Sequence, residues 1–129
     1  VWVPQDQTST RESRTKLPTT VSFADAVFNV GRTALLVAAF AAGDISALQT
    51  ATQDRLHQDV RFKKVPASQA AMLGCIDAGA WCAWLSGSGP TIAAMCDPAD
   101  AQNIADKFPD QGSTMVLRIA AQGAQLLAI

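Results

Sequence analysis

The chain has 129 residues, of which 49% are hydrophobic and 16% charged, and its net charge is -1 with a pI of about 5.6. This length fits one domain, and the absence of a basic excess argues against nucleic-acid binding. We therefore expect residues 1–129 to form a single domain. The low charge content favours a surface that partly faces another domain.

The cysteines and the apolar runs indicate the compartment. Cys75, Cys82 and Cys96 are odd in number and form no C-x-x-C pair, so a disulfide framework is not expected and a reducing, cytoplasmic location is. The longest apolar run, Ala34–Ala42, is far shorter than the ~20 residues that cross a membrane, so no membrane association is expected. The opening Val1–Pro4 has no signal-peptide features and no initiator Met, which favours a chain cut from something longer.

The N-terminal half predicts one short strand followed by helices. Val1–Val3 predicts a strand that ends at Pro4. Ser9 to Glu12 form a capping-box pattern, which predicts a short helical turn that stops before Pro18. A second capping box at Ser22–Asp25 begins a helix, whose apolar positions have helical spacing: Phe23, Val27, Val30, Ala34, Val37 and Ala41.

The end of this helix and the next segment follow from local signals. Its second half is apolar nearly all round, which predicts deep burial. Gly43 is suited to end it, and Asp44 to cap another helix that runs to about Gln58. Val60–Lys64 is expected to be a basic connector.

The C-terminal half alternates strands and helices. Pro66 begins a helix that ends at Gly79. The remaining elements are strands at Trp81–Leu85 and Thr91–Cys96, a helix beginning at Asp97-Pro98 with Ala101, Ile104, Ala105 and Phe108 on one face, and a strand at Ser113–Ile119. The order predicts an α+β, ferredoxin-like split βαβ sandwich, with a four-stranded antiparallel sheet packed by helices.

The most distinctive local feature is a glycine-rich turn between two predicted strands. It comprises Ser86, Gly87, Ser88, Gly89, Pro90 and Thr91. Two glycines let such a loop approach an anion or another loop closely. It lacks the G-K-[ST] of a P-loop, and a strand follows it instead of a helix. A simple hairpin turn is the alternative interpretation.

Two groups of polar residues could bind a ligand. Thr10 and Arg14 lie four residues apart on a predicted helical turn, and an Arg fork suits a carboxylate or phosphate. A solvated surface turn is the alternative. Arg55, His57 and Arg61 cluster after the second helix, and His57 is the only histidine. As a general base it would need an oriented partner, so a polar helix end is the alternative, and no zinc or other metal site is expected.

Three segments together resemble the homoserine kinase family, within the GHMP kinases (galactokinase, homoserine kinase, mevalonate kinase and phosphomevalonate kinase). The segment from Ser9 to Pro18 is similar to the family's S-T-x-x-A-R-x-x-L-P. Val21–Asn29, continuing to Gly43-Asp44, is the second, and Leu85–Thr91 resembles the family's third glycine-rich loop. Asp54–Gln58 adds to the match.

The resemblance implies an activity and a site. Homoserine kinases transfer the γ-phosphoryl of ATP, with Mg²⁺, to the hydroxyl of L-homoserine. By resemblance, Thr10, Arg14 and Arg61 contact the amino acid. Ser86, Gly87, Ser88, Gly89 and Thr91 support the phosphate loop of an N-terminal domain that is absent from this chain. No catalytic residue is implied here, the isolated chain is expected to be inactive, and a homodimer is possible.

Two departures and two alternatives accompany this interpretation. Ser13 replaces the family's Ala, and Asp59-Val60 stands where the family often has Pro-Tyr, which affects the alignment of Arg61. One alternative is another GHMP kinase, of the mevalonate type. The other is a ferredoxin-like regulatory module that binds an amino acid without chemistry, because a fold does not fix a function. A G-L-G-S-S-A-type loop upstream would favour a kinase.

Overall fold

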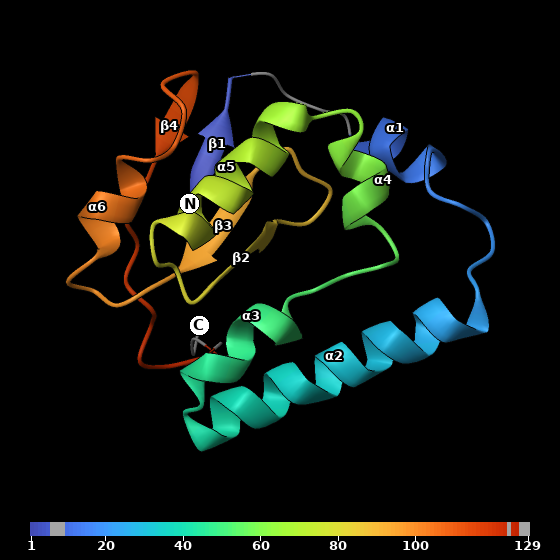
Figure 1. Ribbon diagram of the computed structural model, residues 1–129, viewed down its shortest axis with the longest axis horizontal. Helices are drawn as coiled ribbons and strands as arrows, with labels where there is room; N and C mark the ends of the chain where they lie inside the picture. Colours follow the sequence, from blue (N-terminus) through green and yellow to red (C-terminus); the bar gives the residue numbers. More distant parts are fainter. Residues whose placement is uncertain (6–9, 124, 127–129) are drawn as a thin grey trace.

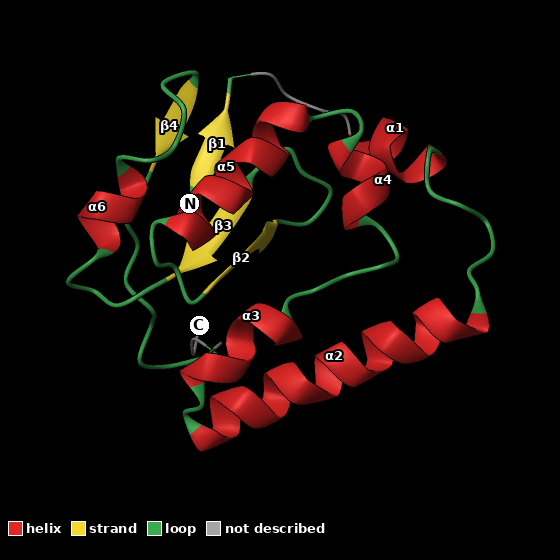
Figure 2. Cartoon of the chain, viewed as in Figure 1, coloured by secondary structure: helices red, strands yellow, loops and turns green. Residues whose placement is uncertain are grey.

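The computed structural model describes residues 1–5, 10–123 and 125–126, and Figures 1 and 2 show its elements. The strands are β1 (Trp2–Pro4), β2 (Cys82–Leu85), β3 (Ile92–Met95) and β4 (Gly112–Thr114). The helices are α1 (Thr10–Thr15), α2 (Phe23–Ala42), the 3₁₀ turn η1 (Ile45–Ala47), α3 (Leu48–Ala51), α4 (Gln58–Phe62), α5 (Pro66–Asp77) and α6 (Ala101–Ala105).

The four strands form one antiparallel sheet in the order β2-β3-β1-β4. Strand β1 lies between β3 and β4, so Trp2 pairs with Ile92 on one side and with Thr114 on the other. This is the strand order of the split βαβ pattern, in which each βαβ unit contributes one central and one edge strand. The predicted fold class is confirmed.

Alternation along β2 divides the core between the two faces of the sheet. Ala83 and Leu85 belong to the main core, which α5 and α6 cover. Cys82 packs on the opposite face with Ala39 of α2 and Leu48 of α3. Figure 1 shows α2 and α3 beside the β2 edge, away from α5.

Trp2 is the largest anchor of the main core. It is 1% exposed, its ring stacks on Phe108 with centroids 6.1 Å apart, and its indole N–H donates to the carbonyl of Pro109 at 3.0 Å. Burying a side chain of this size stabilises a fold by about 1.5–3 kcal/mol. The short β1 strand is therefore fixed by one side chain as much as by its backbone pairing.

Helix α2 has the predicted ends but not the predicted burial. Ser22 caps it by accepting from the Asp25 N–H at 3.0 Å, and Gly43 ends it in the left-handed region at φ 68°. The prediction of deep burial is wrong, because α2 contacts the domain along one stripe and only Ala39 is buried. Val37 remains 64% exposed. By length and composition alone α2 could cross a membrane, a criterion that buried core helices of soluble proteins and signal sequences also meet.

The segment after Gly43 also differs from the prediction. In place of one helix from Asp44 to about Gln58, the chain forms η1 and α3 and then breaks. The Asp54 carboxylate binds the backbone N–H groups at the start of α4 and so begins a new helix, which takes up much of the predicted basic connector. The final strand is also shorter than predicted: β4 covers Gly112–Thr114, and the Met115 N–H adds one hydrogen bond to the Val1 carbonyl at 2.8 Å.

Candidate functional site

The glycine-rich loop is a tight hairpin between β2 and β3. The Ser86 N–H donates to the Thr91 carbonyl at 2.8 Å, and the Gly89 N–H donates to the Ser86 carbonyl at 3.0 Å. Gly87 and Gly89 have φ values of +57° and +73°, which L side chains rarely adopt. The hairpin interpretation and the close-approach interpretation are thus both compatible with the loop's geometry.

The two glycines are held differently. A Cβ on Gly89 would lie 2.9 Å from a Leu85 methyl group, whereas a Cβ on Gly87 would meet nothing within 4 Å. Ser68 of α5 supports the next residue, because its buried hydroxyl donates to the Pro90 carbonyl at 2.6 Å. Gly87 is therefore the open tip of the loop and Gly89 its packed side.

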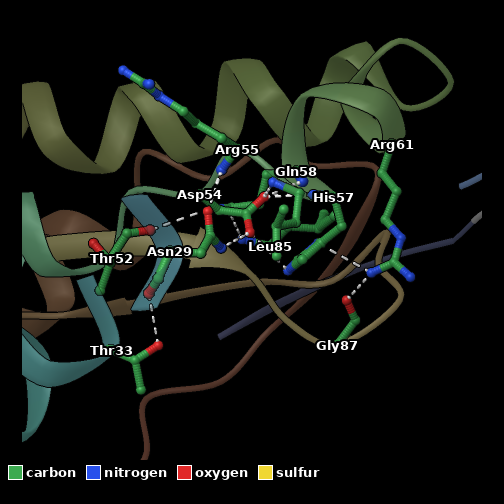
Figure 3. A network of polar contacts seen from close by, with 11 residues as sticks. Asn29, Thr33, Thr52, Asp54, Arg55, His57, Gln58, Arg61, Leu85 and Gly87 are labelled. Carbon is green, nitrogen blue, oxygen red and sulfur yellow. Dashed lines mark hydrogen bonds and ion pairs between the residues drawn. The ribbon is translucent and has the colours of Figure 1, made fainter. Parts of the chain in front are cut away.

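Arg61 lies across the tip of this loop. It stands on α4, which Phe62, 3% exposed, fixes to the main core. The Arg61 Nη1 donates to the Gly87 carbonyl at 2.6 Å (Figure 3). Its Nε is buried and has no hydrogen-bond partner among the described residues. The structure thus joins Arg61 and the glycine loop, which the sequence presented as separate candidates.

Gln58 connects α4 to the sheet. Its side chain is buried, its Oε1 accepts from the Leu85 N–H at 2.7 Å, and its Nε2 donates to the Thr52 carbonyl at 3.2 Å. Leu85 is the last residue of β2, directly before the loop. Gln58 therefore fixes the distance between α4 and the loop.

Asp54 organises the turn that precedes α4. Its Oδ2 accepts from the backbone N–H groups of His57 and Gln58 at 2.7 Å each and of Leu56 at 3.1 Å, and its Oδ1 accepts from Asn29 Nδ2 at 2.7 Å. Burial alone would raise the pKa of Asp54. The backbone and Asn29 hydrogen bonds outweigh burial and hold the pKa below its ordinary value.

Helix α1 packs beside α4 and the loop (Figure 1). Ser13, 7% exposed, donates through its hydroxyl to the Ser88 carbonyl at 3.2 Å. Arg14 is exposed on the same helix. Ser9 lies outside the described residues, as does the Thr10 side chain, so the predicted Thr10 contact stays a prediction.

A small cavity of about 40 Å³ separates α1, α4 and the loop. Its lining includes three cationic residues, Lys16, Arg61 and Lys64, and among the described residues it includes no carboxylate. Such surroundings favour an anion. The remaining lining residues are Ser13, Val60, Val65 and Ser88.

The sequence pattern missed three residues that build this site. In the sequence, Ser13 stands out only as a replacement for the family's Ala, and Asp54 only as part of the Asp54–Gln58 match. Gln58 had no role beyond ending a helix. A capping signal, an Asp directly before a polar segment, could have identified Asp54.

This architecture defines a class: a ferredoxin-like α+β domain whose β2–β3 hairpin carries a glycine-rich loop held by an arginine. The residues 36–114 match the family model described as "GHMP kinases C terminal". The chain belongs to this family.

The relatives that match this chain include several homoserine kinases. The chain is 44% identical over 103 residues to homoserine kinase of Caldanaerobacter subterraneus subsp. tengcongensis, covering 80% of this chain and 33% of that protein. It is 36% identical over 132 residues to homoserine kinase of Desulfitobacterium hafniense, covering 97% of this chain and 44% of that protein. A crystal structure of homoserine kinase from Cytophaga hutchinsonii superposes with a TM-score of 0.77 at 29% identity, covering 81% of this chain and 34% of that one. The chain thus spans between a third and a half of these relatives.

Proposed function

We propose that this chain is the C-terminal domain of a homoserine kinase, which transfers the γ-phosphoryl of ATP to the hydroxyl of L-homoserine and gives O-phospho-L-homoserine. The names of the relatives, at 36–44% identity, support this substrate class. The activity would belong to a longer protein in the cytoplasm. An N-terminal kinase domain is the expected partner, and a homodimer is a further possibility.

The observation that carries the proposal is the position of Arg61. Its guanidinium lies at the loop tip beside a cationic cavity, and its buried Nε has no partner among the described residues. A buried unpaired donor costs about 1–3 kcal/mol, so a ligand that pairs with the guanidinium would recover stabilisation. A planar carboxylate matches the guanidinium fork. Arg61 is proposed to hold the homoserine carboxylate, with Thr10 and Arg14 of α1 completing the amino-acid site.

The loop itself is proposed to support the phosphate site without binding phosphate. Several of its backbone groups bond within this domain. The Ser86 and Gly89 N–H groups donate within the loop. The Gly87 and Ser88 carbonyls accept from Arg61 and Ser13. Ser86, Gly87, Ser88, Gly89 and Thr91 would therefore act as a rigid surface against the other domain.

Phosphoryl transfer is mainly positioning and charge stabilisation, and Mg²⁺ bound to ATP supplies part of that stabilisation. The described residues contain no group of three or more His, Cys, Asp or Glu side chains that could hold a metal ion. No Mg²⁺ ligand is therefore assigned among the described residues. The chain alone is expected to be inactive, because the loop that binds the ATP phosphates is expected in the N-terminal domain.

A product assay tests the proposal. The longer protein that carries this domain is incubated with ATP, Mg²⁺ and L-homoserine, and O-phosphohomoserine is measured by mass spectrometry, with mevalonate as the matched control substrate. We expect product from homoserine only. Product from mevalonate alone, or no product from a folded protein, would contradict the proposal, as would turnover by the isolated 129-residue chain.

A further inference from the structure

Asp54, His57 and Arg61 lie in a line that leads to the glycine loop (Figure 3). The Asp54 Oδ1 is 3.7 Å from His57 Nε2, the His57 Nδ1 is 3.1 Å from Arg61 Nη1, and Arg61 Nη1 is 2.6 Å from the Gly87 oxygen. The function proposed above uses only Arg61 of these three. The roles of His57 and Asp54 follow from which of their atoms can donate a hydrogen bond and which can accept one.

An arginine side chain only donates, because its guanidinium stays protonated. Arg61 Nη1 carries two hydrogens, and its two short contacts are with the Gly87 oxygen and His57 Nδ1. His57 Nδ1 must therefore accept, which makes the ring neutral with its proton on Nε2. That N–H faces the Asp54 carboxylate. The arrangement is consistent only with this tautomer.

We propose that Asp54 and His57 are positioning residues: Asp54 orients the imidazole of His57, and His57 holds Arg61 Nη1 against Gly87 so that Nη2 is presented to the substrate carboxylate. The effect on substrate rests on the proposed function of Arg61. The pairing of His57 with Arg61 does not rest on that function, because both residues belong to this chain and their contact needs no substrate. Both hydrogens of Nη1 are used within the domain, so a ligand must approach the guanidinium from another side.

Protonation of His57 would break this arrangement. Nδ1 would become a donor facing a cation, and the guanidinium would be repelled from Gly87. Burial and the charge of Arg61 lower the pKa of His57, while Asp54 opposes them. Of the other elements, the loop contributes the neutral Gly87 carbonyl and α2 contributes the neutral Asn29 amide and the cation Arg32, which lines the same cavity as His57 and donates to Gln53 Oε1. Arg55 pairs with Asp25.

The imidazole can be observed directly, since His57 is the only histidine in the chain. Two-dimensional ¹H–¹⁵N spectra of the chain against pH give its tautomer and pKa. We expect the Nε2–H tautomer at pH 7 and a pKa that rises in Arg61→Gln. The matched control, Arg55→Gln, removes an adjacent cation that does not contact the ring and should leave the pKa in place. A pKa that does not move in Arg61→Gln overturns the pairing.

Kinetics of the longer protein test positioning. His57→Ala should raise KM for L-homoserine about tenfold, as expected for one lost hydrogen bond to a charged group, with a smaller change in kcat. His57→Asn places an amide oxygen near the position of Nδ1, so it should restore KM. It should also remove the rise in KM that the wild type shows when the pH falls through the lowered pKa of its imidazole. An unchanged KM in His57→Ala, or an acid-dependent KM in His57→Asn, overturns positioning. Absence of any phosphohomoserine from the wild type would instead overturn the proposed function and leave the spectroscopic pairing intact.

Discussion

Replacing Gln58 with methionine tests how α4 is fixed to the sheet. Methionine has nearly the volume of glutamine but cannot accept from the buried Leu85 N–H or donate to the Thr52 carbonyl. A buried N–H without a partner costs about 1–3 kcal/mol. Removing the buried amide recovers part of its own desolvation cost, so we expect a net loss of about 2 kcal/mol in the free energy of unfolding.

Urea unfolding followed by tryptophan fluorescence measures this loss. With a slope of about 2 kcal/mol/M, the midpoint should fall by about 1 M while the slope is unchanged. Gln69→Met, on the exposed side of α5, is the matched control and should stay within about 0.5 kcal/mol of the wild type. A Gln58→Met midpoint equal to that of the control would refute the reasoning.

Three further predictions concern the loop, the thiols and acid stability. Gly87→Ala should lower the free energy of unfolding by about 1–2 kcal/mol, because residue 87 has a left-handed backbone. Gly89→Ala should lower it by about 1–3 kcal/mol more, because its Cβ would also lie 2.9 Å from a Leu85 methyl group. Chemical denaturation of both variants checks which of the two is less stable. Burial raises the pKa of Cys75 to about 11, whereas Cys96 is half-buried. A thiol reagent at pH 8 should therefore label Cys96 of the native chain before Cys75, as measured by mass spectrometry. Equal rates of labelling at the two cysteines would contradict the packing. The pKa of Asp54 is depressed in the folded chain, so the stabilisation by its carboxylate is complete above about pH 4 and is lost as the pH falls further. The free energy of unfolding of Asp54→Asn should therefore depend less on pH below about pH 4 than that of the wild type. Parallel curves of unfolding free energy against pH for the two proteins would contradict this.

Local signals in the sequence predicted much of the fold. Ser22 caps the start of α2 and Gly43 its end, each through contacts within a few residues, so both roles could be predicted from the sequence. Two strand-like runs and the turn residues between them identified the β2–β3 hairpin. The burial of α2 could not be predicted, because an apolar helix surface does not reveal which neighbour covers it.

The assembly of the site depends on contacts between residues far apart in the sequence. Arg61 and Gly87 are 26 residues apart, and Gln58 and Leu85 are 27 apart. The motifs identified Arg61 and the loop separately, but not their hydrogen bond. Asp54 begins α4 through backbone N–H groups within four residues, but its other oxygen accepts from Asn29, 25 residues away, a contact that helical spacing cannot show.

The most direct test of the account measures how much Arg61 contributes to KM for L-homoserine. The longer protein and its Arg61→Gln variant are compared with L-homoserine, with Arg55→Gln as the matched control. We predict that Arg61→Gln raises KM for homoserine about 10- to 100-fold, the loss of one charged hydrogen-bonded pair, while Arg55→Gln changes it less than threefold. An Arg61→Gln enzyme that is folded and keeps the wild-type KM would contradict the assignment of the amino-acid site to this domain.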